Sequence, residues 1–102
     1  GPVDAALNAI QKIVSTFEQI YLKEYRLEAL TGGSGATADV TVKVEDTLNN
    51  TASGRGMKKD IVVGSVEAIV SGINALLAKT EMARAFSTEN DSRVRLSATK
   101  KT

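Results

Sequence analysis

The side chains that most often carry out catalysis are absent from this sequence or scattered along it. Its 102 residues contain no histidine and no cysteine. A Ser-His-Asp triad, a cysteine nucleophile, an imidazole base and a thiolate or imidazole zinc site are therefore all excluded. The carboxylates are spread along the chain, and no pair of them stands beside an activating neighbour. We expect this chain to contain no catalytic residue, no metal ligand and no cofactor.

One glycine-rich stretch suggests phosphate binding. Gly54-Arg55-Gly56 precedes Asp60 at the expected start of a helix, and a helix start of this kind holds anions. The spacing is not that of a P-loop or a dinucleotide fingerprint, however, and the Asp60 carboxylate would repel an anion. We favour a structural role for these glycines, which ease a strand into a helix.

A basic pair suggests nucleic acid instead. Lys58-Lys59 stands before the last expected helix, as in a double-stranded-RNA-binding domain, which needs several cations on that helix to meet phosphates. Here Asp60 and Glu67 follow, and the next cation is Lys79. A solvated helix start is the simpler interpretation, and an RNA-binding-like αβββα module stays the alternative.

The amino-acid composition narrows the class of protein further. Thirteen Lys+Arg against twelve Asp+Glu give a net charge of +1, which offers no general attraction to nucleic acid or to a membrane surface. We expect no apolar run as long as the roughly 18 residues of a membrane span, and we find no signal-peptide pattern. The expected chain is one small cytoplasmic module with neither nucleic acid nor membrane as partner.

Hydrophobic periodicity predicts a first helix from residue 4 to about residue 21. Pro2 and Asp4 suit its first turn, where a missing N–H costs little and a carboxylate meets the positive helix end. Apolar residues recur in steps of three and four, which places one stripe against a core. They are Leu7, Ile10, Val14, Phe17 and Tyr21, with Ile13 and Ile20 beside them.

The period then changes to two, which predicts strands. Apolar and polar residues alternate over residues 23–30 and, more clearly, over residues 39–45. The glycine-rich residues 31–35 separate these two strands. Asn49-Asn50 is typical of a hairpin turn, and residues 51–58 form a weaker third strand.

A second helix follows, with Asp60 as its N-cap. Gly64 and Gly72 interrupt it at a cost of about 1 kcal/mol each, which suggests close approach of another backbone. From Glu81 onward the pattern dissolves, so residues 80–102 are expected to be a polar C-terminal tail, with a short edge strand over residues 93–96 as the alternative. The expected apolar stripe comprises Val66, Ile69, Val70, Ile73, Leu76 and Leu77.

These elements predict an α/β chain of the two-layer α+β class, in the order helix–strand–strand–(strand)–helix. Within it, five stretches in order resemble the C-terminal regulatory domain of the 2-isopropylmalate synthase and citramalate synthase family. The resemblance covers roughly residues 1–78. The stretches are GPVDAA at 1–6, EYRLEALTGG at 24–33, ADVTV at 38–42, GRG at 54–56 and DIVVGSVEA at 60–68.

The resemblance implies a domain of two strand-strand-helix repeats that pairs with its copy in a homodimer. Such a domain binds the pathway's end-product amino acid and feeds back on a distant catalytic barrel, an acetyl-CoA-dependent acyltransferase. By this reading the chain is not an enzyme by itself. Residues 1–79 are a regulatory-domain fragment that begins at the first repeat's helix, with two strands lying upstream.

The resemblance also implies an effector site, when the family's effector-binding positions are transferred to this sequence. Backbone N–H groups at a helix start or in the glycine-rich loop would hold the effector's carboxylate. Asp4 would hold its ammonium, and small apolar side chains would surround the rest. The implied effector-binding residues are Val3, Asp4, Leu22, Tyr25, Ala29, Ala36 and Ile61.

Strand geometry constrains this site. Tyr25 and Ala29 share one strand face, whereas Leu22 has the opposite parity. Leu22 joins them only if a bend or bulge occurs near Lys23. Tyr25, Ala29 and Ile61 are also the residues that an ordinary core strand and helix would present, so a core role is the alternative.

The expected function is therefore that of the regulatory domain of 2-isopropylmalate synthase, in leucine biosynthesis. Leucine would be a feedback inhibitor bound at the dimer interface, with a coupling of about 1–3 kcal/mol to the barrel. The alternative is a citramalate synthase domain that senses isoleucine. Leucine and isoleucine differ only in the position of one methyl branch. In an apolar pocket this difference changes the binding free energy by only about 1–3 kcal/mol. A dimerisation module without ligand is the remaining alternative.

Overall fold

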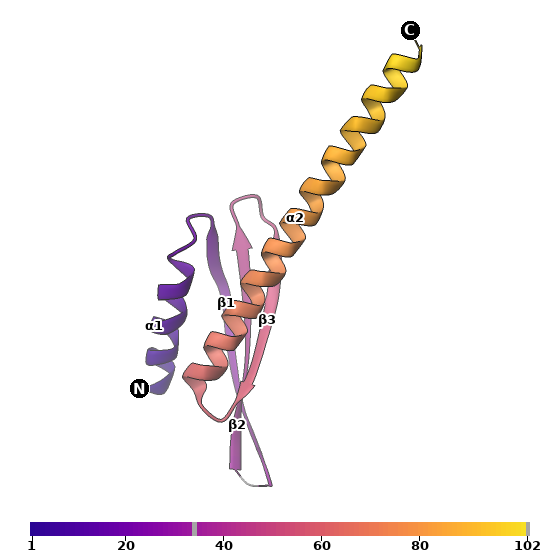
Figure 1. The fold of residues 1–102 in the computed structure, drawn as a ribbon. Coiled ribbons are helices and arrows are strands. Elements are labelled where there is room, and N and C mark those ends of the chain that lie inside the picture. Colours follow the sequence, from indigo (N-terminus) through magenta and orange to yellow (C-terminus); the bar gives the residue numbers. More distant parts are fainter. Residues whose placement is uncertain (34, 102) are drawn as a thin grey trace.

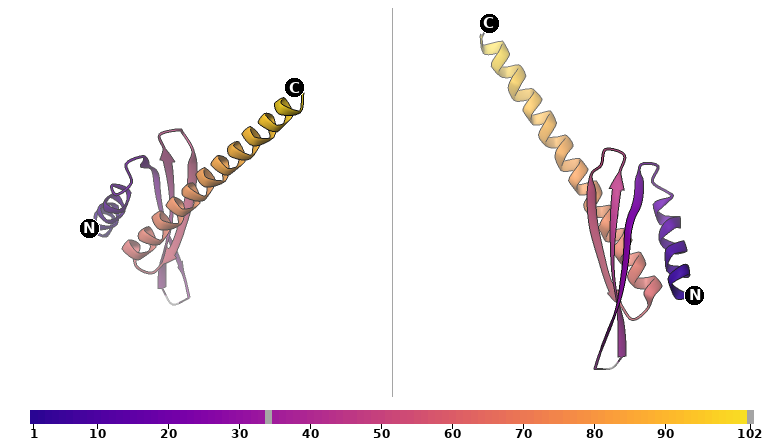
Figure 2. Two further views of the ribbon diagram at one scale, coloured as in Figure 1. Left: turned by 45° about the horizontal axis from the view of Figure 1, so that its top comes forward. Right: turned by 180° about the vertical axis from the view of Figure 1, so that it is seen from behind.

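The computed structural model describes residues 1–33 and 35–101, with side chains described as far as residue 89. Three strands form one antiparallel sheet in the order β1-β2-β3, and both helices lie on the same face of it (Figures 1 and 2). The two-layer fold class is confirmed, and the third strand is present. The elements are α1 (Pro2–Val14), β1 (Ile20–Gly32), β2 (Gly35–Asp46), β3 (Thr51–Lys58) and α2 (Ile61–Lys101).

The core lies between the sheet and the two helices. The central strand β2 contributes Val40, Val42 and Val44, all fully buried, while the residues between them lie on the open polar face. Ile10 of α1 and Ile69 of α2 pack onto this row from the helix layer. Burial of each such side chain stabilises the fold by about 1.5–3 kcal/mol, so the alternating valines fix which face of the sheet the helices cover.

Helix α2 packs directly against β3 because neither backbone carries large side chains where they meet. A Cβ atom on Gly56 would overlap the carbonyl oxygen of Gly64, and one on Gly54 would overlap the backbone of Ala68 and Gly72. The predicted close approach of a second backbone is thus confirmed. The glycines of β3 do not ease the strand into the helix, as the sequence analysis favoured, but make room for the helix axis.

Helix α1 ends at Val14, so the predicted helix to about residue 21 is too long. The hydroxyl of Ser15 donates to the Lys12 carbonyl at 2.9 Å, and that of Thr16 donates to the Ile13 carbonyl at 2.7 Å. Ile20 already pairs with Asp46 in the sheet. The helical spacing through residues 17–21 was misleading because long-range strand pairing overrode the local preference.

A bulge interrupts β1 at the place where the site implied by the resemblance needed one. Leu22 pairs with Val44 and Glu24 with Lys43, which leaves Lys23 as the extra residue. Because a one-residue bulge reverses the parity of the strand, Leu22 and Tyr25 both pack against the core cluster. The expectation of a bend near Lys23 is confirmed.

The predicted hairpin turn is confirmed after Asp46. One carboxylate oxygen of Asp46 accepts hydrogen bonds from the backbone N–H groups of Leu48 at 2.9 Å and Asn50 at 2.8 Å. The second oxygen accepts from the Asn50 side chain at 2.9 Å. Asn49 adopts a φ of 65°, which asparagine tolerates better than most residues. This turn holds the start of β3 beside the end of β2.

The start of α2 is confirmed, and its buried face is the predicted one only in part: Ile69, Ile73 and Leu76 are buried as expected. The Asp60 carboxylate accepts a hydrogen bond from the Val63 N–H at 3.0 Å, as an N-cap does. Val70 and Leu77, expected in the buried stripe, are exposed. The small residues Gly64 and Gly72 take the buried positions instead, because contact with β3 turns the helix toward its smallest side chains.

Helix α2 continues well beyond the sheet. It runs unbroken through Lys101 and projects away from the rest of the fold (Figure 1), so the pattern does not dissolve at Glu81. The alternative of an edge strand over residues 93–96 is wrong, since these residues are helical. The expected boundary between residues 79 and 80 falls within this helix and remains a prediction.

The same helix corrects the expectation about apolar runs. Over Ile61–Glu89, α2 is long and apolar enough to cross a membrane, with a mean hydropathy of 1.9 in its most apolar 18-residue window. Length and composition of this kind are equally typical of a helix packed in a core. Part of that window, 39%, is buried inside the structure, where it packs on the sheet.

We predict that Gly56→Ala lowers the free energy of unfolding by about 3 kcal/mol, because the new methyl group forces α2 off β3. Gly32→Ala is the matched control, since a Cβ at Gly32 meets nothing within 4 Å, and it should change stability by less than about 0.5 kcal/mol. Urea unfolding measures both. Equal stability of the two variants would contradict the close packing.

Acid stability should depend on the ion pair across the open sheet face. Arg55 donates to both carboxylate oxygens of Asp39, at 2.8 and 2.7 Å, and this hydrogen bonding holds the pKa of Asp39 below its ordinary value of 3.8. A depressed pKa stabilises the fold above the ordinary value, and that contribution is lost as pH falls through the folded-state pKa.

The free energy of unfolding of the unmodified chain should therefore fall as pH is lowered from about 5 to about 2. Asp39→Asn and Arg55→Gln should each make this fall less steep, because each removes one partner of the pair. Urea titrations across this range test the expectation. Three parallel curves would show that the pair contributes nothing to acid stability.

Candidate functional site

A small apolar hollow lies where the β1–β2 hairpin extends past the start of α2. Its volume is about 130 Å³. The hollow exists because alanines occupy the strand positions there, so the hairpin backbone and the first turn of α2 do not fill the space between them. It is lined by Leu27, Ala29, Ala36, Thr37, Ala38, Lys59 and Ile61.

Three of the seven predicted effector-binding residues meet at this hollow. Ala29 comes from β1, Ala36 from β2 and Ile61 from the first turn of α2. They are far apart in the sequence, and antiparallel pairing brings the first two together, since Ala29 pairs with Ala38 and Thr31 with Ala36. The predicted apolar lining is thus partly assembled at one place.

Tyr25 lies one step further along the same strand face. Its hydroxyl group is 2.8 Å from the hydroxyl of Ser65, which is fully buried on α2. Ser65 is one helical turn beyond Ile61, and Tyr25 is four residues before Ala29, so the pair ties β1 to α2 directly behind the hollow. Tyr25 itself does not line it.

The other three predicted residues lie elsewhere. Val3 and Asp4 are exposed in the first turn of α1, where the Asp4 carboxylate is 3.4 Å from the Gly1 nitrogen. Leu22 packs against the core near the opposite end of β1. None of the three lines the hollow, so the predicted ammonium partner, Asp4, is not part of it.

The structure adds residues that the sequence analysis did not include. Leu27 shares the parity of Tyr25 and Ala29, so strand alternation alone was enough to find it. Lys59 was considered only as a phosphate contact, although its place just before the N-cap Asp60 puts it beside the helix start. Ser65 gave no sequence signal, because a serine in a helix is most often solvated.

The lining of the hollow is mostly apolar and includes one cation. Alanine, leucine and isoleucine side chains make up most of it, and Lys59 is its charged member. Lys59 adds a full positive charge, whereas the start of α2 is already capped by the Asp60 carboxylate, which accepts a hydrogen bond from the Val63 N–H. The arrangement therefore favours a small ligand with an apolar part and a carboxylate.

The start of α2 is a weaker candidate for RNA. Lys58 forms an ion pair with Glu67 of α2 at 3.4 Å, and no Lys or Arg occurs between residues 60 and 78. Recognition of duplex RNA requires cations that reach successive phosphates. Lys58 is paired with an acidic residue, and the helix carries no cation over residues 60–78, so this surface offers few contacts for phosphates.

We predict that Tyr25→Phe costs about 1–2 kcal/mol of stability, because it leaves the buried Ser65 hydroxyl without its partner. The double variant Tyr25→Phe with Ser65→Ala should recover part of this loss, since both polar groups are then removed. Urea unfolding of the two single variants and the double variant measures the coupling. Strictly additive losses would show that the hydrogen bond contributes no stability.

Known proteins are similar to this chain over the region that contains the hollow. The model of the LeuA allosteric (dimerisation) domain family matches residues 1–77. A protein from Methanopyrus kandleri that carries the name of a 2-isopropylmalate synthase is 48% identical over 77 residues, covering 74% of this chain and 15% of that protein. A 2-isopropylmalate synthase from Methanocaldococcus jannaschii is 48% identical over 81 residues, covering 79% of this chain and 15% of its own length.

Relatives of a second kind are nearly as similar. A protein from Methanoculleus marisnigri that carries the name of an (R)-citramalate synthase is 44% identical over 77 residues, covering 76% of this chain and 15% of that protein. The chain thus spans about 15% of the length of the curated relatives it matches. On the match over residues 1–77, the chain belongs to the LeuA allosteric (dimerisation) domain family.

Proposed function

We propose that this chain is the effector-sensing part of a 2-isopropylmalate synthase and that leucine binds in the hollow at the start of α2. The observation that carries the proposal is the meeting of Ala29, Ala36 and Ile61 around one apolar space. This space lies in a domain whose family is described as allosteric. The leucine side chain would occupy the apolar part of the hollow, and its carboxylate would face Lys59.

A ligand there would act on three elements at once. The hollow is bounded by β1, β2 and α2, and the Tyr25–Ser65 contact joins β1 to α2 just behind it. Binding would therefore favour one position of α2 relative to the β1–β2 hairpin. In a homodimer, with a catalytic acyltransferase barrel elsewhere in the full protein, a change in this position would be transmitted as feedback inhibition.

A citramalate synthase that senses isoleucine is the second candidate. It is supported by the relatives of that name, which match this chain over the same residues with 44% identity. Leucine and isoleucine have the same number of atoms and differ in branching, so the hollow distinguishes them by no more than about 1–3 kcal/mol. For either enzyme we propose a location in the cytoplasm.

Calorimetric titration of the chain with leucine, isoleucine, lysine and a short RNA duplex tests this function. We expect saturable heat with leucine, weaker heat with isoleucine and none with lysine or RNA. Ala29→Leu should abolish the heat, because the larger side chain fills the hollow. Ala78→Leu is the control, at an exposed position on α2, and should leave the heat unchanged.

Three results would contradict the proposal. Equal leucine heats for Ala29→Leu and Ala78→Leu would place binding outside the hollow. Stronger binding of isoleucine than of leucine would favour the citramalate enzyme. Binding of the RNA duplex with a steep dependence on salt would favour a nucleic-acid module instead.

A further inference from the structure

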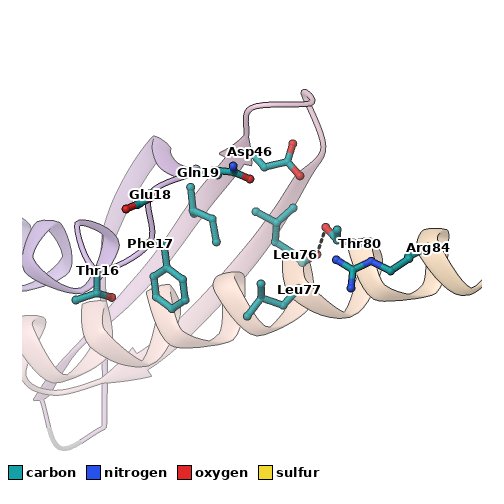
Figure 3. Close-up of a pocket in the computed structure, with 10 residues that line it drawn as sticks. Thr16, Phe17, Glu18, Gln19, Asp46, Leu76, Leu77, Thr80 and Arg84 are labelled. Carbon is teal, nitrogen blue, oxygen red and sulfur yellow. Dashed lines mark hydrogen bonds between the residues drawn. The ribbon is translucent and has the colours of Figure 1, made fainter.

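Several polar groups around the cavity between the α1–β1 connection, the end of β2 and the middle of α2 already serve the fold (Figure 3). The cavity has a volume of about 450 Å³. Both carboxylate oxygens of Asp46 accept hydrogen bonds within their own turn. The Thr80 hydroxyl donates to the Leu76 carbonyl at 2.9 Å, and Arg84 forms an ion pair with Glu81. The edge of the sheet, in contrast, offers a continuous row of backbone groups.

Strand β1 is an edge strand of 13 residues, and β2 is its only neighbour in the sheet. An edge strand presents a row of N–H and C=O groups that have no partner within the sheet. In the described part of the chain, no hydrogen bond from outside the sheet reaches the backbone of residues 24–32. The outward backbone groups of this stretch are therefore available to another strand.

Residues 24–32 lack three of the features that protect sheet edges, namely prolines, bulges and charges on the inner face. The stretch contains no proline, and the bulge at Lys23 disturbs only the start of the strand. Its inner-face side chains are uncharged, and they belong to Tyr25, Leu27, Ala29 and Thr31. This part of the edge is thus open to pairing.

Helix α1 extends the helix layer past this edge. It packs against α2 and β1, and it lies beside β1 rather than over the middle of the sheet (Figures 1 and 2). A strand added to β1 would thus have a helix above it, as β2 and β3 have α2.

The side chains on the open face of β1 alternate in charge. Glu24, Arg26 and Glu28 stand at every second position. The Arg26 side chain is 75% exposed and lies 3.9 Å from Glu24, which is a loose contact. Glu28 forms no ion pair with another described residue, although its charge acts on Arg55 across the sheet face. Since opposite charges stabilise a cross-strand pair and like charges destabilise it, this edge selects a strand with the inverse order of charges.

A second copy of β1 offers that inverse order when it runs antiparallel. A two-fold dimer of this kind keeps the helices of both copies on one side of the sheet, so the axis passes beside one residue and not between two. With the axis at Leu27, Arg26 of each copy lies opposite Glu28 of the other. The same register sets Leu27 against its own copy and Tyr25 against Ala29, a large side chain against a small one.

Neighbouring registers are less favourable. An axis at Arg26 or at Glu28 sets that side chain against its own copy, so like charges meet directly. An axis at Tyr25 leaves the bulge at Lys23 only two residues away, and a bulge disrupts the ladder. Of these registers, the axis at Leu27 alone gives two ion pairs within an unbroken ladder.

We propose that residues 24–30 of β1 pair antiparallel with the same residues of a second copy, about a two-fold axis at Leu27. The two three-stranded sheets then form one continuous sheet. The family is described as a dimerisation domain, which calls for a second copy but names no surface. The proposal does not rest on the proposed function, because it follows from the open edge and its charges whether or not an amino acid binds.

Charge reversal with recovery tests the contact. Arg26→Glu should weaken dimerisation at least about tenfold in sedimentation equilibrium, because both cross-strand pairs become pairs of like charge. The double variant Arg26→Glu with Glu28→Arg should recover the original dimerisation, since it restores both pairs in inverted form. Arg84→Glu is the matched control, at an exposed arginine on α2, and should leave dimerisation unchanged.

Disulfide trapping tests the register. The chain contains no cysteine, so the Arg26→Cys and Glu28→Cys variants can be mixed and oxidised, and mass spectrometry then identifies which chains are linked. In this register, positions 26 and 28 of opposite copies lie within the Cα distance of a disulfide, whereas two copies of position 26 lie diagonally and too far apart. We expect the mixed disulfide and little of either disulfide between identical chains.

The following results would overturn the contact. Equal dimerisation of the Arg26→Glu and Arg84→Glu variants would place the second copy on another surface, and a chain that stays monomeric would exclude it altogether. A double variant that is folded by circular dichroism but does not recover dimerisation would show that the two side chains do not meet. Disulfides between identical chains in the same yield as the mixed disulfide would reject the axis at Leu27.

Discussion

The close approach of α2 to β3 is the contact on which the rest of the structure depends. Two backbones meet where Gly54 and Gly56 face Gly64, Ala68 and Gly72. Because no side chain separates them, the helix axis has little freedom to shift or rotate. That position of the helix determines that Ile61 reaches the hairpin, that Ser65 meets Tyr25, and that Leu76 closes the core.

The glycines at this contact make both β3 and α2 intrinsically less stable. Glycine in a helix or a strand interior is less favourable than alanine by about 0.5–1 kcal/mol, and four glycines occur at one contact. Burial of Ile69, Ile73 and the β2 valines offsets that cost. The contact is therefore a constraint on position rather than a source of stability, as expected where the placement of a site matters.

Most of the fold followed from the sequence because its signals were local. Valine alternation identified β2, and Asp60 marked the start of α2. The bulge at Lys23 was expected only from the position that the resemblance gave to Leu22. The misplaced features depended on contacts between distant residues. Pairing of Ile20 with Asp46 ended the helical pattern early, and the glycine contact turned Val70 and Leu77 toward solvent.

Less of the candidate effector site could be predicted, again because it depends on contacts between distant residues. Ala29, Ala36 and Ile61 came from the resemblance, and the hairpin and α2 bring them together. Lys59 and Ser65 take their positions from the helix seating, which residue spacing does not encode. The cavity between the α1–β1 connection, the end of β2 and the middle of α2 had no sequence signal, because its lining joins three separate segments whose contact appears only in the folded chain.

The central claim is that the seating of α2 builds an amino-acid site from the hairpin and the helix start. A crystal structure of the chain grown with leucine tests it most directly. The account predicts electron density for leucine between Ala29, Ala36 and Ile61, with its carboxylate toward Lys59 and α2 seated on Gly54 and Gly56. An empty hollow in crystals soaked to saturation, or a helix displaced from β3, would contradict it.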